Sequence, residues 1–225
     1  MKDIEKSNGL LVFFDTETTG LPKNFNAPSS DVENWPRLVQ LSWIVTDIDG
    51  NRIKEEDHII FPEDFKIPEA ATAIHGITTS RAMEEGEPIS QVLKLFMDDV
   101  NRSEAVIGHN VEFDKHIVGA ELVRQHQEDI MESKKSICTM HSSIDFCAIE
   151  GYYGYKYPKL QELHTTLFGS PFKDAHNAFS DVTATEKCFR ELVRRDVIQL
   201  DIPKKDQTRK ESLEPSGQAR HQIRR

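Results

Sequence analysis

The sequence has few cysteines and no long apolar run, and each absence excludes a class of protein. The three cysteines, Cys138, Cys147 and Cys188, form no paired motif among the 225 residues, which indicates reduced thiols rather than a disulfide framework. No apolar run approaches the roughly 20 residues of a membrane span, and the first residues lack the apolar core of a signal peptide. We therefore expect a cytoplasmic protein with no membrane partner.

Positive charge is scarce as well. The formal net charge is −10, and no basic stripe precedes residue 201. A protein that coats long nucleic acid is usually basic on at least one face, so the composition argues against that class. Bound metal ions can supply positive charge locally, so the composition remains compatible with a metal-dependent enzyme. A Gly-rich phosphate cradle is also missing, which argues against a magnesium-dependent phosphatase.

Apolar patterning predicts one α/β domain built on a single mixed sheet. Residues 10–14 form an apolar run of the right length for a strand that is buried on both faces. Residues 38–47 and 52–60 predict two further strands, joined by the turn Asp49-Gly50. Together these segments predict an antiparallel three-stranded meander.

Alternation of strands and helices later in the chain predicts parallel strands beside the meander. Residues 105–109 predict a short strand, and we expect the Asn110 side chain to cap a helix over residues 111–127. Residues 61–79 are expected to be a connection, and residues 137–140 another short strand. Amphipathic patterning predicts three more helices, over residues 88–100, 159–168 and 177–195.

The composition changes at about residue 201. Residues 201–225 contain seven Lys or Arg and four Asp or Glu, with Pro and Gly interspersed. Such a segment cannot bury enough apolar surface to order itself. We therefore predict a domain over residues 1–200 and a flexible polar tail over residues 201–225.

Two acids, Asp15 and Glu17, directly follow the first apolar run. Side chains alternate along a strand, so both carboxylates point to one side if the strand continues. Like charges this close repel each other unless a proton or a cation lies between them. A divalent metal site with oxygen ligands suited to Mg²⁺ or Mn²⁺ is one interpretation. Ordinary surface charge at a solvated strand end explains this stretch, taken alone, equally well.

Residues later in the chain could complete such a site. Asp114 lies in the first turns of the helix after the predicted strand at residues 105–109, and neighbouring parallel strands end close together. Glu112 lies two residues away round the helix and is expected to point elsewhere. His176 and Asp181 are five residues apart, so they converge only if His176 lies in a loop before the last helix.

The order of these residues resembles the three motifs of the DEDDh exonucleases. This DnaQ-like superfamily includes the proofreading (epsilon) subunits of bacterial DNA polymerase III, and the resemblance covers residues 8–196. The position four residues before Asp181 is Asn177 rather than Tyr, so the histidine class fits. The matching segments are Asp15-Thr16-Glu17-Thr18-Thr19-Gly20, His75-Gly76-Ile77-Thr78, His109-Asn110 before Phe113-Asp114, and His176 with Asp181.

The resemblance implies a ribonuclease H-like fold, with a five-stranded mixed sheet flanked by helices, and 3′→5′ hydrolysis of nucleic acid to nucleoside 5′-monophosphates. It also implies two divalent cations, Mg²⁺ or Mn²⁺, held by Asp15, Glu17, Asp114 and Asp181. Asp15 would bridge both ions, and Asp114 would act through water. His176 would take the proton from the attacking water, which a neutral imidazole can do near neutral pH.

The same resemblance places four residues around a single-stranded 3′ end. Thr18 would offer backbone donors to the terminal sugar, and His75 would border the nucleotide pocket. Leu21 and Phe113 would pack on the last bases. The polar loop that follows Gly20 is expected to border the site.

Several alternatives remain open. DNA is the favoured substrate, with proofreading or repair as the role, but RNA-trimming and oligonucleotide-degrading exoribonucleases belong to the same superfamily. A non-catalytic module that binds nucleic-acid ends beside a polymerase is an alternative of another class, although all five catalytic positions are filled. Gln199-Leu200-Asp201-Ile202-Pro203 partly resembles a peptide that docks replication proteins on a sliding clamp, so a clamp partner is a further alternative, and a proofreading role would require a polymerase partner.

Two side-chain groups outside these motifs also have alternative interpretations. One is an aromatic cluster formed by Tyr152, Tyr153, Tyr155 and Tyr157. We expect it to pack on the core as part of a loop, with contact to nucleic-acid bases as the alternative. The other group contains Cys138, His141 and Cys147, which lack a fourth ligand at suitable spacing, so we do not expect a zinc site.

Overall fold

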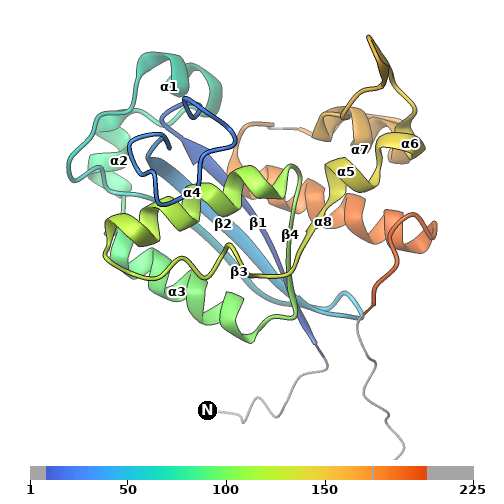
Figure 1. Cartoon of the computed structure of the whole chain (residues 1–225), viewed down its shortest axis with the longest axis horizontal. Coiled ribbons are helices and arrows are strands. Elements are labelled where there is room, and N and C mark those ends of the chain that lie inside the picture. The colour runs from blue at the N-terminus through green and yellow to red at the C-terminus, as the bar shows by residue number, and fades with distance from the viewer. Residues whose placement is uncertain (1–8, 174, 202–225) are drawn as a thin grey trace, which may run out of the picture.

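The computed structural model describes residues 9–173 and 175–201, and its centre is a five-stranded mixed sheet (Figure 1). The strand order is β3-β2-β1-β4-β5. β1 pairs antiparallel with β2 and parallel with β4, so the predicted meander and the predicted parallel strands are both confirmed. The strands are β1 (Leu10–Thr18), β2 (Leu38–Asp47), β3 (Arg52–Ile59), β4 (Ala105–Gly108) and β5 (Ser136–Cys138).

Helices cover both faces of the sheet because β1 sends apolar side chains to both. One face of β1 packs on α3 (Ile89–Arg102) and α4 (Val111–Arg124), with Phe14 against Phe96 at 5.2 Å between ring centroids. The other face packs on α7 (Leu160–Phe168) and α8 (Ala178–Arg194), with Phe13 against Phe189 at 5.2 Å between ring centroids. The central strand is therefore rigidly held up to the point where its acids begin.

The predicted helices are confirmed, but the expected cap of α4 is wrong. Asn110 has a left-handed backbone, with φ 73° and ψ 41°, and its side chain makes no capping hydrogen bond. Asparagine tolerates this conformation better than most residues do. The residue therefore turns the chain sharply from β4 into α4 instead of capping the helix. α7 ends as predicted at Gly169, whose left-handed backbone has φ 78°.

The segment over residues 61–79 was expected to be a connection, but it contains regular structure. It forms α1 (Glu69–His75), and α2 (Thr79–Glu85) begins at its end. Helices this short are marginal in isolation, so periodicity gives a weak signal for them. They are stabilised by packing, since Ala71, Ile77 and Ala82 form a small apolar cluster with Val39 of β2.

The segment between β5 and α7 also differs from expectation. The strand predicted over residues 137–140 is confined to β5, and the chain continues as α5 (Thr139–Ser142) and α6 (Ile144–Cys147). It then forms a separate two-stranded hairpin, β6 (Glu150–Gly151) and β7 (Gly154–Tyr155).

The tyrosines of this hairpin do not pack on the core. Tyr152 and Tyr153 are 90% and 96% exposed, and Tyr155 and Tyr157 are 53% and 59% exposed. The expectation of a packed loop is therefore wrong. A two-residue turn projects its side chains away from the hairpin, so nothing behind the turn can cover them.

Among the described residues, no helix has both the length and the apolar character needed to cross a membrane. The tail predicted over residues 201–225 lies outside the described residues, apart from Asp201. The same holds for Ile202 and Pro203 of the clamp-like peptide.

Candidate active site

The acids Asp15 and Glu17 lie near the carboxyl end of β1, on the face that packs on α8. Leu11 and Phe13 point to this face, and strand alternation sends Asp15 and Glu17 the same way. In the neighbouring strand β2, Ser42 lies opposite Asp15 and Gln40 lies opposite Glu17. The register shifts directly after Glu17, so the regular pairing stops where the second acid is presented.

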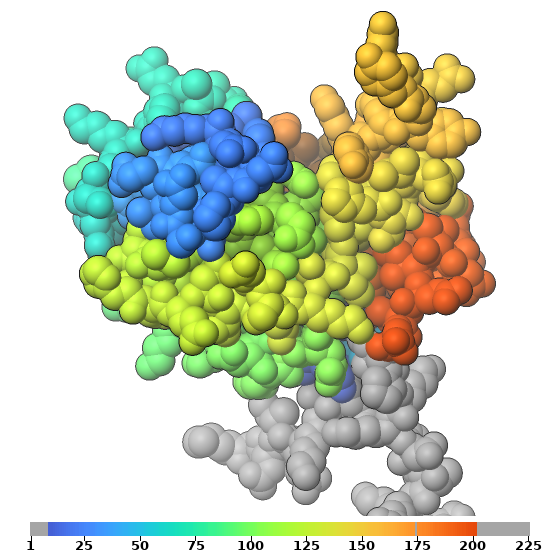
Figure 2. All heavy atoms as spheres, in the orientation of Figure 1, coloured from blue at the N-terminus to red at the C-terminus, as the bar shows by residue number. Residues whose placement is uncertain are grey.

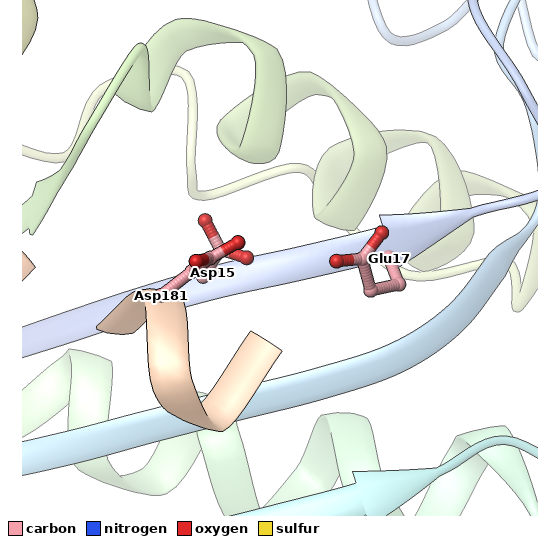
Figure 3. Close-up of side chains that lie close together, drawn as sticks. All are labelled: Asp15, Glu17 and Asp181. Carbon is pink, nitrogen blue, oxygen red and sulfur yellow. The ribbon is translucent and has the colours of Figure 1, made fainter. Parts of the chain in front are cut away.

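The third acid, Asp181, comes from the first turn of α8. One ligand atom from each of Asp15, Glu17 and Asp181 can be chosen so that all lie within 4.8 Å of one another. Figure 3 shows the Asp181 carboxylate beside Asp15, with Glu17 further along the strand. Three residues that are distant in the sequence are therefore brought to one point.

The start of α8 is fixed by two hydrogen bonds. Asn177 Oδ1 accepts a hydrogen bond from the Ser180 amide at 3.1 Å, which caps the helix. The His176 amide donates to Asp181 Oδ2 at 3.1 Å. His176 lies in the loop with a left-handed φ of 68°, as its convergence with Asp181 required, and its side chain is exposed. The loop thus orients the carboxylate through its backbone and leaves the imidazole free.

Asp114 joins the cluster from the opposite side of β1. Its Oδ1 accepts hydrogen bonds from the Thr16 amide at 3.1 Å and the Thr16 hydroxyl at 2.5 Å. Thr16 lies between the two strand acids, so it ties Asp114 to them. Glu112, the competing acid, is exposed and bonded to Lys115 and Ser136, which confirms that it points elsewhere.

Burial and mutual repulsion raise the pKa of the two strand acids. The pKa of Asp15 is raised well above its ordinary value, first by burial and then by the charges of Asp114, Asp181 and Glu17. Burial also raises the pKa of Glu17 to about 8, with further contributions from Asp181 and Asp114. Without a cation, Glu17 would hold a proton near neutral pH, and the raised pKa of Asp15 favours its protonated form in the same way.

The pKa values of the two acids on helices, Asp114 and Asp181, are also raised, but hydrogen bonds to their carboxylates oppose this rise. Burial raises the pKa of Asp114 to about 7, against the stabilising hydrogen bonds from Thr16. Burial raises the pKa of Asp181 to about 6, against the amide hydrogen bond and the charge of His176. All four carboxylates therefore favour the presence of a neutralising positive charge.

The donor set fits a divalent cation with oxygen ligands. Asp181 Oδ1 is buried and has no hydrogen-bond partner, which leaves an acceptor directed into the cluster. Carboxylate oxygens suit Mg²⁺ and Mn²⁺. Within residues 9–173 and 175–201, no other group of His, Cys, Asp or Glu side chains meets the same metal-binding geometry.

The residues expected around the 3′ end lie near the same edge of the sheet, in different environments. Thr18 is buried at the end of β1, and its hydroxyl donates to the Gly20 carbonyl at 2.7 Å. His75 is buried, which lowers its pKa against the opposing effect of the Thr18 carbonyl. Leu21 is 75% exposed and is free to contact a ligand.

The fourth such residue, Phe113, is half-buried within an aromatic wall on α4. Its ring centroid lies 6.5 Å from that of Phe25 and 6.4 Å from that of Trp35. Both partners belong to the loop after β1, which Arg124 holds by bonding the carbonyl oxygens of Val32 and Trp35. The loop predicted to border the site is therefore attached to α4.

Two positioning residues lie outside the predicted set. Thr16 bonds Asp114, as described above, and Gln40 accepts a hydrogen bond from the Ala178 amide at 3.4 Å while donating to Asp57 at 2.7 Å. Gln40 thereby links β2 to the start of α8. Its signal in the sequence is a polar residue inside an otherwise apolar strand, where a buried amide needs partners.

Comparison with known families agrees with this arrangement. The family profile described as RNase T, exonuclease, matches residues 12–189, which is most of the chain. The chain belongs to this exonuclease family. Its fold is the ribonuclease H-like fold expected from the motifs. No curated protein matches the sequence.

Solved structures of Escherichia coli exonuclease I share the fold of this exonuclease chain. The complex with a dT13 oligonucleotide is 22% identical with a TM-score of 0.65, and the match covers 83% of this chain and 41% of that one. The complex with dA16 gives the same values. A zinc-bound complex with single-stranded DNA is 19% identical with a TM-score of 0.66 and covers 84% and 41%. The chain thus spans about two fifths of the exonuclease I chains.

Proposed function

We propose that this protein is a metal-dependent 3′→5′ exonuclease of the DEDDh type. It would remove nucleoside 5′-monophosphates from single-stranded 3′ ends, with DNA as the favoured substrate. The observation that carries the proposal is the convergence of Asp15, Glu17 and Asp181 within 4.8 Å in a chain of the exonuclease family. The dT13 and dA16 oligonucleotides bound to exonuclease I support single-stranded DNA as the substrate class.

Four carboxylates would hold two divalent cations, Mg²⁺ or Mn²⁺. Asp15 is the candidate to serve both ions because the charges of all three other acids act on it, while Glu17 and Asp181 would complete the cluster and Asp114 would act from the α4 side. When bound, such ions polarise the phosphate and lower the pKa of water. The protein's own contribution is rigidity, since β1, α4 and α8 fix the ligands before the substrate arrives.

His176 is the proposed general base. The residue lies next to the cluster because its backbone amide bonds Asp181 Oδ2 at 3.1 Å, and its side chain is exposed. A neutral imidazole nitrogen can accept the proton of the attacking water, while the backbone hydrogen bond keeps the carboxylate oriented. Binding of the terminal nucleotides is assigned to Thr18, Leu21, His75 and Phe113.

One panel of substrates tests direction and substrate class together. It contains single-stranded DNA, mismatched duplex DNA, single-stranded RNA and dinucleotides, each labelled at either the 5′ or the 3′ end. The proposal expects the 3′-labelled nucleotide to appear first as a 5′-monophosphate, with manganese or magnesium present and not with a chelator. Faster cleavage of RNA or dinucleotides than of DNA would favour the exoribonuclease alternatives.

A matched pair of variants keeps this test specific. Asp15→Asn removes a proposed ligand, whereas Glu112→Gln removes an exposed acid from the same region without touching the cluster. If Asp15→Asn retains the activity of the unaltered protein after repurification, the proposed site is wrong. Binding of a labelled 3′ end without any hydrolysis would favour the non-catalytic module.

The domain division is proposed as well: residues 1–200 as the exonuclease domain, followed by a polar tail. A sliding-clamp partner would bind through the segment over residues 199–203, and a proofreading role would require a polymerase partner. Absence of binding between a peptide of residues 196–225 and a clamp would remove the clamp partner from consideration.

A further inference from the structure

The β6–β7 hairpin presents an aromatic surface that the proposed catalytic mechanism does not use. Its two-residue turn consists of Tyr152 and Tyr153, whose rings meet edge to face with centroids 4.6 Å apart. Both side chains are at least 90% exposed. Large aromatic side chains gain free energy by leaving water, so an exposed pair of them at a projecting turn indicates a binding surface.

The base of the hairpin is attached to the active-site end of the sheet. The strand β4 pairs in parallel with β1, with Ile107 beside Phe13. Two residues further along the chain come Asp15, still in β1, and His109, directly after β4, so the two lie at the same edge of the sheet. His109 Nε2 bonds the carbonyl oxygen of Pro158 at 2.9 Å, and Pro158 is buried. The segment that leaves the hairpin is thus fastened beside the first catalytic acid.

This attachment is stable at physiological pH. Burial lowers the pKa of His109 to about 4, so the ring is neutral. Nε2 then donates its hydrogen to the Pro158 carbonyl, and Nδ1 lies 2.9 Å from the Thr139 hydroxyl oxygen. The hairpin therefore stands on a defined base, and its tip remains open to solvent.

The hairpin also lies on one side of a hollow in the surface. Figure 2 shows this hollow between the blue and cyan segments, which include the loop after β1, and the yellow and orange segments, which include the hairpin. In Figure 1 the hairpin lies at the upper right, and α1 and α2 lie on the opposite side, at the upper left. A strand that enters the site between these walls passes the hairpin.

The local charge does not oppose a polyanion. Over residues 150–162 the two lysines, Lys156 and Lys159, balance the two acids, Glu150 and Glu162, whereas the chain as a whole carries a formal charge of −10. Lys156 Nζ forms an ion pair with Glu162 Oε1 at 2.6 Å, while Lys159 is exposed. Aromatic rings interleaved with positive charge are the features that bind single-stranded nucleic acid without sequence preference.

We propose that the hairpin is a stacking surface for the bases of a single-stranded nucleic acid, a few nucleotides before its 3′ end. The inference rests on the proposed exonuclease function, because that function brings a strand to this edge. Tyr152 and Tyr153 supply the stacking faces, and Lys159 faces the phosphates. The hairpin extends the part of the strand that contacts the protein and does not touch the reacting phosphate. It therefore acts on affinity rather than on the chemical step.

The test compares ring removal with ring retention in the full-length protein. Tyr152→Ala/Tyr153→Ala removes both faces, whereas Tyr152→Phe/Tyr153→Phe keeps them and removes only the hydroxyls. Titration of a fluorescent 15-nucleotide strand, in an Asp15→Asn background that prevents hydrolysis, measures affinity. Stacking is worth about 1–3 kcal/mol per base, so Kd should rise about 5- to 150-fold for one lost stack in the alanine pair. The phenylalanine pair should stay within about 3-fold.

Abasic substitutions locate the contact. Removing the base at one position of the strand should weaken binding to the parent protein, and this penalty should disappear in the alanine pair. Hydrolysis of dinucleotides should be the same in both proteins, because the proposal places the hairpin beyond the two terminal nucleotides. A Leu95→Ala variant, which alters an exposed side chain on α3, controls for a general loss of apolar surface.

Each outcome decides the matter. Unchanged strand affinity in the alanine pair overturns the proposal, even if the protein is an active exonuclease. If sedimentation shows that the alanine pair abolishes self-association instead, the hairpin binds a second copy of the chain and the proposal is also overturned. If no hydrolysis is found with any substrate, the binding titration still tests the hairpin, and only the exonuclease assignment fails.

Discussion

The carboxylate cluster and the β6–β7 hairpin depart from ordinary folding preferences in opposite directions. The cluster gathers four acids whose pKa values burial raises, whereas the hairpin leaves the large apolar rings of its turn tyrosines exposed to solvent. Neither arrangement helps the chain to fold. Both lie toward the same edge of the sheet, so the comparison indicates that this edge is shaped by ligand binding rather than by stability.

The two regions differ in how they are held. The carboxylates are fixed by strand alternation, by Thr16 and by the start of α8, so that small displacements are resisted. The hairpin has two short strands and one anchored base, and its tip packs on nothing. A metal site needs that rigidity because ligand distances decide affinity, whereas a stacking surface tolerates movement because every base has a flat face.

The largest expected effect comes from Asp15→Asn, which would break the cluster. We expect turnover to fall by at least about 10³-fold, because bound metal ions stabilise the transition state by several kcal/mol. The same change should raise the Tm measured with a chelator at pH 8, because it removes one buried carboxylate from a cluster of carboxylates that repel one another. Turnover assays and thermal melts measure the two effects. A loss of activity accompanied by a lower Tm would point to misfolding instead.

The next largest effect is expected from His176→Ala. A positioned general base contributes about 10²- to 10⁴-fold, so kcat should fall by that factor. The affinity for manganese, measured by calorimetry, should be nearly unchanged because the backbone amide still bonds Asp181. His126→Ala, at an exposed residue just after α4 that has a left-handed φ of 57° like His176, is the control and should alter neither quantity. Lost manganese binding in His176→Ala would make His176 a metal ligand.

A smaller effect is expected from pH in the chelated protein. Asp15 and Glu17 have raised pKa values in the folded state, so the native protein binds more protons than the unfolded chain between about pH 4 and pH 8. Stability contributed by these groups is therefore present at low pH and is lost as the pH rises through the folded pKa values. The Tm with a chelator should fall from pH 5 to pH 8 relative to that of Asp15→Asn/Glu17→Gln.

Magnesium should reverse this loss, because the cation replaces the protons. The gap between the Tm values with magnesium and with chelator should widen as the pH rises. A gap that stays constant from pH 5 to pH 8 would contradict the cation-binding role of the cluster.

The smallest expected effect is that of the hairpin tyrosines on the free energy of unfolding. Tyr152→Ala/Tyr153→Ala should change the free energy of unfolding by less than about 0.5 kcal/mol, because exposed side chains contribute little. Phe189→Ala, which removes a buried ring from the core, should cost about 3–5 kcal/mol. Chemical denaturation measures both. A large loss in the tyrosine pair would mean that the hairpin is structural.

Much of the fold could be predicted because it depends on local patterns. The apolar run of β1, the meander and the four longer helices follow from side-chain periodicity. The short helices α1 and α2 were missed because their stability comes from tertiary packing rather than from their own sequence. The cap at Asn110 was predicted from residue type, but the tight turn between β4 and α4 imposes a left-handed backbone there.

The tyrosines show a different limit. Their apolar character favours burial, and nothing in the local sequence indicates that Tyr152 and Tyr153 fall in a two-residue turn. Only the pairing of β6 with β7 places them at a tip that the core cannot reach. Thr16 and Gln40 were missed for a similar reason, since their partners lie 98 and 138 residues away.

The sequence by itself determined which residues are chemically suited to the site. Residue types and spacing identify two alternating acids at the end of a buried strand and a third acid in the helix predicted over residues 111–127. They also identify a His–Asp pair at the start of the helix predicted over residues 177–195. Only the tertiary structure decided that Asp15, Glu17 and Asp181 come within 4.8 Å while Asp114 reaches them through Thr16. The reason is physical, because repulsion among carboxylates favours separation, and only the packing of α4 and α8 on opposite faces of β1 holds them together.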